Sequence, residues 1–428
     1  MTKIRNLIYG LIIVGIFVII HWIFPREWSP WLQKTDALFQ GTRLQFIGLF
    51  IFGVFLFVIY PLFHGIGFLA SFGKVKYPKG SENFTPPLSV IIPALNEEKI
   101  IGPTLDSFVN SKYPKENLEI VVVASGSTDR TVEICQEYQD RLNLKIVTDP
   151  LSKKGKPAAL NLGLKNASHD ILCIFDSDLH VKEDTLQYLV RPLYDPEITA
   201  SCGPIELRNW NVNKLTKAIA IEYAFMVGMG LYYEIRQRLG RSLWFLGRNY
   251  CIRRDVMEEV GGWNEDALTE DLHLSVQLSM LNKKIAHAPH AVTNELAPTT
   301  WKTYKHQRRR WVGGYKQGLN AAMELDKRSV ILRNFGMLHF GHINNFALVA
   351  IIPALIFGLV VNDYYLMLIC ITEFIFTFGM AVISIKKYGN RRYRLLLYYP
   401  VFFVTNFYMF AVQLTNIPTD EWVKTEKV

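Results

Sequence analysis

Long apolar runs stand at both ends of this 428-residue chain and constrain its fold more than any other feature. Residues 7–24 and 44–72 form one group, and residues 346–361, 365–385 and 395–414 form the other. A helix needs roughly 20 apolar residues to cross a hydrocarbon core. We therefore expect two transmembrane helices within residues 1–76. Three more are expected within residues 334–428, followed by a short C-terminal tail.

The first apolar run allows two interpretations. Lys3 and Arg5 precede it, as in a secretory signal, but His21, Trp22 and Pro25 follow it instead of a small-residue cleavage site. We therefore expect a retained helix. Basic residues beside the spans mark the cytoplasmic side. They fall on one side of the five expected spans: Lys3, Arg5, Lys74, Lys76, Lys79, Lys386, Lys387, Arg391, Arg392 and Arg394. This predicts a multi-pass integral protein of the cell membrane with residues 77–333 in the cytoplasm.

Charge and cysteine content narrow the class of protein further. The net charge is +9, but the basic clusters lie beside the apolar runs, where they suit anionic membrane lipids. We therefore expect membrane lipids as partners and no nucleic acid. The five cysteines include no CxxC pair, which makes a zinc site or a disulfide framework a weak interpretation. A reducing cytosol around the middle of the chain fits this pattern.

The middle of the chain alternates between strand and helix patterns. Apolar, β-branched runs predict strands over residues 88–92, 118–123, 144–148 and 171–175. Helical spacing predicts helices over residues 96–110, 129–138 and 158–165, the second of them capped by Ser127 and Thr128. This alternation predicts a mostly parallel sheet with helices on both faces. Ligands of such sheets bind beyond the carboxyl ends of the strands.

Two acidic residues follow the fourth predicted strand. Asp176 and Asp178 are separated by one residue, so their carboxylates can share one metal ion. Mg²⁺ or Mn²⁺ at this place would bridge them to a diphosphate and neutralise a leaving group. The alternative is a solvated turn, but the position at a strand end favours a binding site.

Two further motifs stand at expected helix starts. Lys156 belongs to a basic turn before residues 158–165, and such a turn suits phosphate; the alternative is an exposed lysine-rich turn. Glu270 and Asp271 precede a leucine-rich helix, where a carboxylate can act as general base on a hydroxyl. The alternative is that Thr269 caps this helix and both acids complement its dipole.

A rarer combination occupies residues 307–311, which read Gln-Arg-Arg-Arg-Trp. Guanidinium groups bind diphosphates through paired hydrogen bonds, and an indole offers a flat surface to a sugar ring. The alternative is a basic amphipathic helix that lies on the lipid surface. Both interpretations can hold for one segment.

The order of these motifs resembles that of membrane-bound family-2 glycosyltransferases of the GT-A fold and QxxRW type, such as cellulose, chitin, hyaluronan and poly-N-acetylglucosamine synthases. The resemblance covers residues 87–318 and rests on six motifs in order: residues 93–98, 126–129, 155–161, 176–178, 269–271 and 307–311. It implies an α/β GT-A (nucleotide-diphospho-sugar transferase) domain with flanking transmembrane α-helices, divided into residues 1–76, 77–333 and 334–428.

The resemblance also implies roles for individual residues. Asp271 would be the catalytic base, with Glu270 as a less favoured substitute. Asp176 and Asp178 would hold Mg²⁺ or Mn²⁺ and the donor diphosphate. Family members invert the anomeric centre, so an α-linked donor gives a β-linkage. The other residues that would bind the donor are Pro93, Asn96, Glu98, Ser125, Asp129, Lys156, Gln307, Arg310 and Trp311.

Two positions depart from the family pattern. Ala124 and Ser125 stand where relatives carry acidic residues that contact the nucleobase, which weakens the expectation of uridine. A UDP-sugar is still the donor that the resemblance favours. Arg248, in a loop where synthases often have a Gly-Ser or Gly-Pro step, suits an anionic lipid head group or an acidic sugar.

Several functions compete on this evidence. The leading hypothesis is a glycosyltransferase that extends a polysaccharide and passes it through its own spans. The second is transfer of a single sugar to a membrane lipid, as in glucosylceramide synthase-like enzymes. A non-enzymatic scaffold or transporter is disfavoured because the acidic and QxxRW motifs are intact. A nucleotidyltransferase would need a glycine-rich triphosphate loop, which the sequence lacks.

Overall fold

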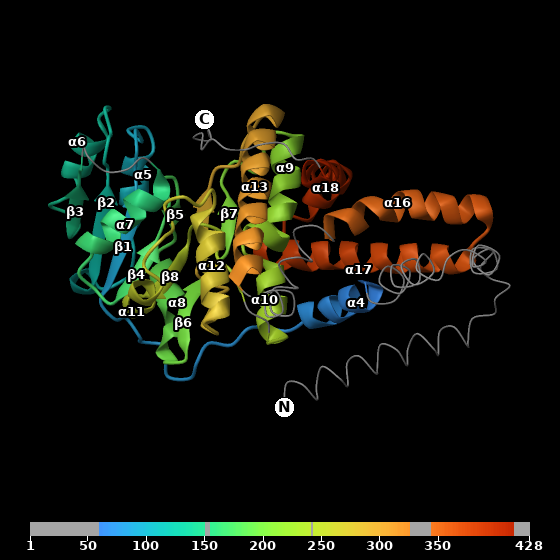
Figure 1. Cartoon of the computed structure of the whole chain (residues 1–428), viewed down its shortest axis with the longest axis horizontal. Coiled ribbons are helices and arrows are strands. Elements are labelled where there is room, and N and C mark those ends of the chain that lie inside the picture. Colours follow the sequence, from blue (N-terminus) through green and yellow to red (C-terminus); the bar gives the residue numbers. More distant parts are fainter. Residues whose placement is uncertain (1–59, 150–154, 241–242, 326–343, 415–428) are drawn as a thin grey trace. The chain divides into compact units, whose positions relative to one another are not determined.

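The computed structural model describes residues 60–149, 155–240, 243–325 and 344–414. The chain divides into two compact units, of which one comprises Met1–Phe72 with Asn344–Ala381 and the other Gly73–Ile343 with Val382–Val428. The elements of both are labelled in Figure 1. The predicted span over residues 7–24, and the part of the second span before residue 60, lie outside the described residues.

A seven-stranded sheet forms the centre of the larger unit. Its strand order is β3-β2-β1-β4-β8-β6-β9. The four predicted strands are confirmed as β1 (Leu88–Pro93), β2 (Leu118–Val123), β3 (Leu144–Val147) and β4 (Ile171–Ile174), all parallel. The others are β6 (Ile198–Cys202), β8 (Tyr250–Arg253) and β9 (Lys284–His287). Because β8 runs antiparallel to both β4 and β6, the sheet is mixed.

The predicted helices around this sheet are also present, the first two shorter than predicted and the third longer. They are α5 (Ile101–Val109), α6 (Thr131–Gln136) and α7 (Lys156–Asn166), and α7 packs on β1, β2 and β3. The capping role expected for Ser127 and Thr128 is wrong, because α6 begins only at Thr131 and both residues bond to the loop after β1. Further helices are η3 (Lys115–Asn117), α8 (Thr185–Val190), η4 (Arg191–Tyr194), α11 (Arg254–Glu259) and α12 (Glu270–Met280).

Buried apolar residues make the strands the core of this unit. Every residue of β2 and β4 is buried, as expected of parallel strands that are covered on both faces. The β-branched residues of β1 and β2 fill this interior because they fit a pleated surface well. The core thus holds the carboxyl ends of β1, β2 and β4 in a fixed register.

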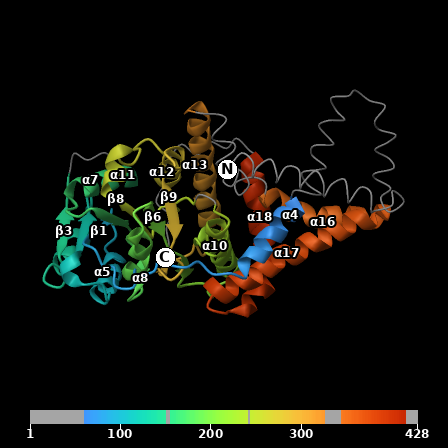
Figure 2. The same cartoon turned by 90° about the horizontal axis from the view of Figure 1, so that it is seen from below.

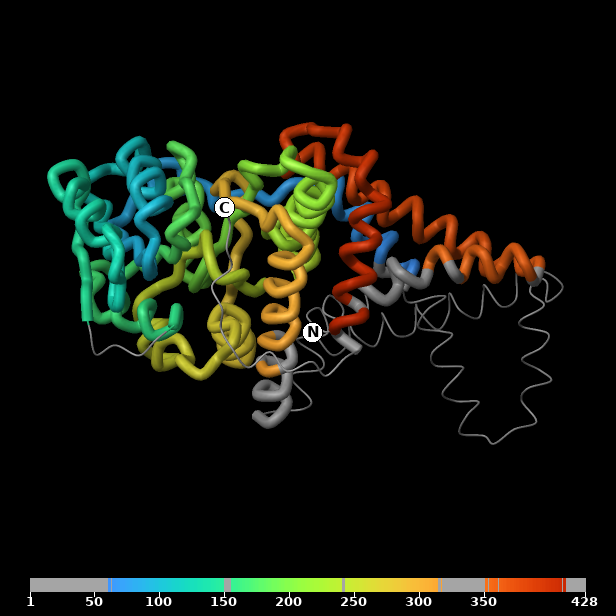
Figure 3. The backbone as a smooth tube through the Cα atoms, turned by 90° about the horizontal axis from the view of Figure 1, so that it is seen from above, coloured from blue at the N-terminus to red at the C-terminus, as the bar shows by residue number. Residues whose placement is uncertain are grey.

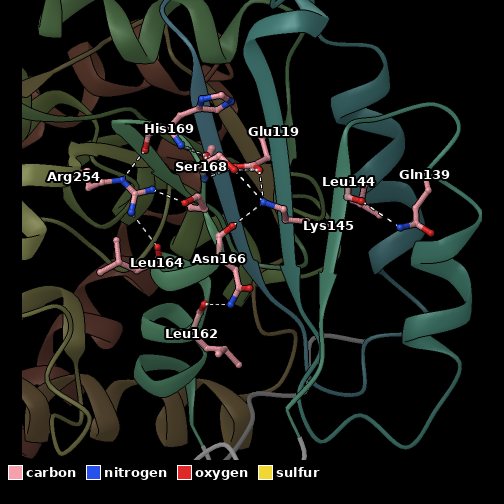
Figure 4. Close-up of polar contacts among 12 residues, drawn as sticks. Glu119, Gln139, Leu144, Lys145, Leu162, Leu164, Asn166, Ser168, His169 and Arg254 are labelled. Atoms are coloured by element: carbon pink, nitrogen blue, oxygen red, sulfur yellow. Dashed lines mark hydrogen bonds and ion pairs between the residues drawn. The ribbon is translucent and has the colours of Figure 1, made fainter.

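A polar cluster occupies the opposite, amino end of these strands, as the close-up in Figure 4 shows. The buried Glu119 carboxylate accepts hydrogen bonds from Ser89 Oγ at 2.5 Å, Ser168 N at 2.8 Å and Lys145 Nζ at 3.0 Å. Burial opposes ionisation, but the hydrogen bonds from Ser89 and Ser168 prevail and lower the pKa of Glu119 to about 2. The neighbouring Arg254 donates to three main-chain oxygens. All these groups are satisfied internally, which indicates a structural role.

The same unit contains a second, smaller sheet and a group of helices. A three-stranded sheet has the order β5-β10-β7, with β5 at His180–Val181, β7 at Ile205–Leu207 and β10 at Thr293–Glu295. The helices α9 (Lys214–Glu222), α10 (Leu231–Arg238), α13 (Trp301–Leu325) and α18 (Tyr399–Leu414) come next, with η5 (Tyr223–Val227) and η7 (Tyr393–Tyr398). The helix α18 packs on α9 and α13. Figures 2 and 3 show α13 beside the sheet domain from below and from above.

The apolar runs within the described residues are helical, as α4 (Tyr60–Ser71), α16 (Asn344–Val361), α17 (Tyr364–Tyr388) and α18. Two stretches of the described residues are long and apolar enough to cross a membrane, namely 214–238 and 364–388. The first is 89% buried within the protein, as core helices of soluble proteins are, and the second is 28% buried. Two such helices are weak evidence of a membrane protein by themselves.

Glu373 is expected to face protein or water, and the smaller unit provides its partner. Its Oε2 atom lies 2.5 Å from His64 Nδ1, and both side chains are buried between α4 and α17. A carboxylate in an apolar helix is costly unless it is hydrogen-bonded in this way. A carboxylate inside the apolar run at residues 365–385 predicts either a hydrogen bond between helices or a place in a polar passage, and the structure shows the hydrogen bond.

Candidate active site

The predicted site residues gather at one edge of the large sheet. Because β1, β2 and β4 are parallel and adjacent, the loops after them meet at their carboxyl ends. These loops carry Pro93 to Glu98, Ser125 to Asp129, and Asp176 with Asp178. Residues from α7, α12 and α13 join them, as described below.

The loops after β1 and β2 are fastened to each other by side chains predicted to bind a donor. Asn96 Oδ1 accepts from Thr128 N at 2.8 Å, and Asp129 Oδ2 accepts from Glu98 N at 3.1 Å. Glu98 Oε2 in turn accepts from Arg130 N at 3.1 Å. Asn96, Glu98 and Asp129 therefore hold the loops after β1 and β2 together. Their contact with a donor stays a prediction.

Pro93 and Ser125 stand where these two loops begin. Pro93 is the last residue of β1. Ser125 Oγ accepts from Asp149 N at 2.9 Å, which connects the loops after β2 and β3. A hydroxyl still has a donor hydrogen and a second lone pair when it accepts one hydrogen bond. Ser125 thus keeps the capacity to recognise a nucleobase.

Lys156 stands at the centre of the acidic residues. Its Nζ atom lies 2.7 Å from Asp176 Oδ1 and 3.1 Å from Glu270 Oε1, and it donates to Gly247 O at 2.7 Å. Burial opposes the charge on this lysine, but the charges of Asp176 and Glu270 prevail and raise its pKa. The alternative that Lys156 belongs to an exposed lysine-rich turn is therefore wrong. Residues 150–154 lie outside the described residues.

Asp271 holds its proton more tightly than an ordinary aspartate. Its partly buried position and the charge of Glu270 raise its pKa to about 7, against the opposing charges of Lys156 and Arg310. A carboxylate that exchanges its proton near neutral pH is suited to general base catalysis. Thr269 is the N-cap residue of α12 but makes no side-chain cap hydrogen bond, so that part of the alternative is wrong, whereas Glu270 and Asp271 do lie in the first turn, where acids complement the helix dipole.

Gly247 closes the site from the side of the loop before β8. A Cβ atom at this position would lie 3.3 Å from Asp271 Oδ2 and 3.4 Å from Lys156 Nζ. Its φ angle is +77°, a left-handed conformation that glycine adopts without strain. The sequence marks the loop of Gly247 and Arg248 as a departure from the family pattern, but no pattern in it assigns Gly247 to the site.

Replacing Gly247 with alanine is expected to cost about 1–2 kcal/mol of stability through the left-handed backbone. It should also lower kcat, roughly threefold or more, because Asp271 Oδ2, 3.3 Å from the new methyl group, must shift by a few tenths of an ångström. Gly261 is a matched control, since its φ is +78° and a Cβ there would meet nothing within 4 Å. Thermal unfolding and steady-state rates of G247A and G261A check this. Equal activities of the two variants would contradict the assigned position of Gly247.

The Gln-Arg-Arg-Arg-Trp segment lies on α13, beside α12. Gln307 is buried, while Arg310 and Trp311 are partly buried, and the charge of Arg310 acts on Asp271. Gln317, further along α13, accepts from Leu268 N at 2.8 Å and so fastens this helix to the segment before α12. The charge of Arg310 therefore reaches Asp271, and the contact of Gln307, Arg310 and Trp311 with a donor stays a prediction.

Arg248 does not have the role suggested by the sequence. Its Nε lies 2.5 Å from Glu295 Oε2, its Nη1 donates to Leu246 O at 2.6 Å, and its Nη2 contacts Glu295 Oε1 at 2.9 Å. All three nitrogens are therefore used within the buried interior. The expected binding of an anionic head group or acidic sugar by Arg248 is wrong, because Glu295 already neutralises it.

The acidic pair fits a divalent cation in its donor type and its charge. Among the described residues, no three His, Cys, Asp or Glu side chains are placed to share a metal ion. Mg²⁺ is usually held by only one or two carboxylates together with substrate phosphates, so two aspartates suffice. The ammonium of Lys156, 2.7 Å from Asp176, shows that this carboxylate holds a positive charge here. Asp178, two residues further along the chain, is buried.

Comparison with known proteins defines the class to which this fold and site belong. Residues 86–314, over half of the chain, match the family described as "Glycosyltransferase like family 2". The chain therefore belongs to this family of glycosyltransferases.

Individual relatives show how the family matches this chain. The probable glycosyltransferase YdaM of Bacillus subtilis is 35% identical over 64% of this chain and 66% of its own length. A poly-beta-1,6-N-acetyl-D-glucosamine synthase of Staphylococcus epidermidis is 28% identical over 62% and 65%. A beta-monoglucosyldiacylglycerol synthase of Nostoc sp. is 30% identical over 60% and 54%. The chain spans less than two thirds of the length of these relatives.

A solved structure confirms the GT-A α/β fold of the large unit. The mannosyltransferase PcManGT from Pyrobaculum calidifontis, in complex with GDP-Man and Mn²⁺, matches with a TM-score of 0.52 at 22% identity. The match covers 76% of this chain and 94% of that protein.

Proposed function

We propose that this chain transfers a sugar from a nucleotide-diphospho-sugar, with a UDP-sugar as the first candidate, to a hydroxyl group with inversion at the anomeric carbon. The observation that carries this proposal is the convergence of Lys156, Asp176, Asp271 and Arg310 at the carboxyl edge of the sheet. This cluster combines a carboxylate that titrates near pH 7 with two permanent cations. A hydroxyl nucleophile needs a carboxylate that accepts its proton, and a diphosphate leaving group needs cations that offset its charge.

The proposed reaction is a single displacement. Asp271 accepts the proton of the acceptor hydroxyl while that oxygen forms a bond to the anomeric carbon. The bond from the anomeric carbon to the diphosphate oxygen breaks, and the nucleoside diphosphate leaves with the electron pair. Lys156 and Arg310 offset the charge that develops on it. A Mg²⁺ or Mn²⁺ ion held by Asp176 and Asp178 would supply further positive charge to the diphosphate.

Arg310 provides independent support for an anionic ligand. Its Nε atom is buried and makes no hydrogen bond to any of the described residues. A buried donor without a partner costs about 1–3 kcal/mol. A donor diphosphate would satisfy this atom, which agrees with the role proposed for Arg310.

The rate should depend on pH in one direction. Below pH 7 Asp271 is increasingly protonated and cannot accept a proton, since its pKa is raised to about 7. We therefore expect kcat/KM to increase roughly 10-fold between pH 6 and pH 8, because this ratio reports the free enzyme. Initial rates at constant ionic strength from pH 5.5 to 8.5 measure it. A flat or falling profile over this range would remove Asp271 from the role of base.

The proposed setting is a multi-pass membrane protein with its catalytic domain in the cytoplasm. The helices α16 and α17 support this because they expose many apolar side chains, among them Ile352, Ile356, Phe357, Val360, Leu368, Ile371 and Phe374. Surfaces of this kind on a soluble monomer are rare. Together with the basic residues next to the apolar runs, they fit a lipid environment.

The acceptor is proposed to be a growing polysaccharide, with a membrane lipid as the alternative. One relative is a polysaccharide synthase and another a glycolipid synthase by name, so the family supports both. His64 and Glu373 bond to each other inside the smaller unit, so this pair does not decide between the two acceptors. The polysaccharide is placed first because residues 307–311 resemble the motif of polysaccharide synthases.

The function is tested by incubating the detergent-solubilised full chain with UDP- and GDP-sugars, with Mn²⁺, with Mg²⁺ and with EDTA. Both nucleotides belong in the panel because Ser125 replaces an acidic base contact and because PcManGT was solved with GDP-Man. A long polymer in the sized products supports the first acceptor, and a single glycolipid supports the second. Absence of turnover with every donor would favour a non-enzymatic scaffold.

A further inference from the structure

Three consecutive arginines, Arg308, Arg309 and Arg310, stand within the Gln-Arg-Arg-Arg-Trp segment, and the fold gives each a different environment. Arg309 is exposed and donates to Tyr408 OH at 3.1 Å, whereas Arg310 faces the acidic cluster. Arg308 is completely buried, with 0% of its surface exposed. A buried guanidinium is rare unless it has a specific partner. Arg308 therefore calls for an explanation that the proposed reaction does not provide.

Two aromatic rings enclose the Arg308 guanidinium on one face of α13. Its Cζ atom lies 4.0 Å from the ring centroid of Trp311 and 4.6 Å from that of Tyr304. Tyr304 and Trp311 stand four residues before and three residues after Arg308, so the helix places all three on the same face. Both contacts are cation–π interactions, which attract the guanidinium to the ring faces. Arg308 thereby restricts the orientation of the Trp311 indole.

Polar contacts of Arg308 fix a second residue of the motif. Its Nη1 donates to Gln307 Oε1 at 2.9 Å, and its Nη2 donates to Glu222 Oε2 at 2.8 Å. Because the Gln307 oxygen faces Arg308, the Nε2 donors of this amide are the part that can serve an anion. Glu222 ends α9, so the ion pair also fastens α13 to α9, the two helices that are labelled side by side in Figure 1.

We propose that Arg308 is a positioning residue, which sets the Gln307 amide for the donor diphosphate and the Trp311 indole for the sugar ring. This inference rests on the proposed function, because that function gives Gln307 and Trp311 their ligands. Arg308 touches neither ligand and acts through its two neighbours. A planar guanidinium is required, since only this group can stack on Trp311 while it donates separately to Gln307 and Glu222.

The first test is a double-mutant cycle with Arg308→Lys and Gln307→Ala. R308K is expected to lower kcat roughly 10- to 100-fold, as displacement of a binding group by about 1 Å does. KM for the nucleotide sugar should change less. In the Q307A background the same replacement should cost clearly less than in the wild type, because the part of the effect that passes through Gln307 is already lost and only the part through Trp311 remains. Fully additive losses would overturn the proposal.

The matched control is Arg309→Lys, one residue further along the same helix. Arg309 is exposed, so R309K should keep kcat within about twofold, as exposed substitutions usually do. A loss in R309K equal to that in R308K would show that any change in this segment impairs the enzyme, and would overturn the specific role of Arg308.

A second variant keeps the test decisive if R308K folds poorly. Replacing a buried ion pair by apolar residues of similar volume is often neutral or stabilising, so R308M/E222M is expected to fold. A folded R308M/E222M protein with kcat reduced at least about 10-fold supports positioning by the guanidinium. A folded one with wild-type kcat would show that the pair only stabilises the fold. If the wild-type chain itself turns over no donor, the proposed function fails, and not the assignment of Arg308.

Discussion

Replacing Asp271 with asparagine is expected to lower kcat by roughly 10²- to 10⁴-fold, the range that a general base contributes. Asparagine has almost the same size and cannot accept the proton of the acceptor hydroxyl. The loss should appear in kcat, while donor affinity stays within about threefold, because the base acts only in the transition state. Titration of D271N with a nucleotide sugar, beside its steady-state rates, separates the two quantities.

Glu270→Gln is the control for this assignment. Glu270 is buried and lies 3.1 Å from Lys156 Nζ, so its carboxylate forms an ion pair with the lysine. E270Q should therefore reduce the rate less than D271N. It should also shift the rising part of the pH profile to lower pH, because the charge of Glu270 raises the pKa of Asp271. Loss of activity in E270Q with a normal rate in D271N would transfer the role of base to Glu270.

The part of this site that lies on parallel strands is predictable from the sequence. The strands β1, β2 and β4 are short, apolar runs bounded by polar residues, and each is followed directly by a motif. Because the carboxyl ends of parallel strands meet at one edge, the local pattern alone is enough to place Asp176 together with the loops after β1 and β2.

Contacts between distant segments are not predictable in this way. Arg248 and Glu295 are far apart in the sequence, and no periodicity joins them. The reversed strand β8 has only four residues, too few for its pattern to distinguish it from a helix segment or a loop. The burial of Arg308 is partly predictable from the sequence. The spacing of Tyr304, Arg308 and Trp311 places them on one helix face. This spacing distinguishes Arg308 from the other two arginines of the motif.

Replacing Lys156 with methionine is expected to lower kcat/KM by roughly 10²- to 10³-fold, as the loss of one group that stabilises transition-state charge does. The ammonium lies 2.7 Å from Asp176 and 3.1 Å from Glu270, so its removal takes the positive charge away from two neighbouring carboxylates. The site would then repel a diphosphate that the lysine attracts. Methionine keeps the length of the side chain, which limits the change to the charge.

The same replacement should move the pH profile in a defined direction. The positive charge of Lys156 lowers the pKa of Asp271, so without it Asp271 holds its proton to higher pH. The rising part of kcat/KM in K156M is therefore expected above that of the wild type, and K156R, which keeps the charge, should restore it. Lys165→Met is the matched control, because Lys165 is exposed at the other end of α7. A K156M enzyme with reduced rate and an unmoved profile would mean that Lys156 serves the donor alone and does not tune the base.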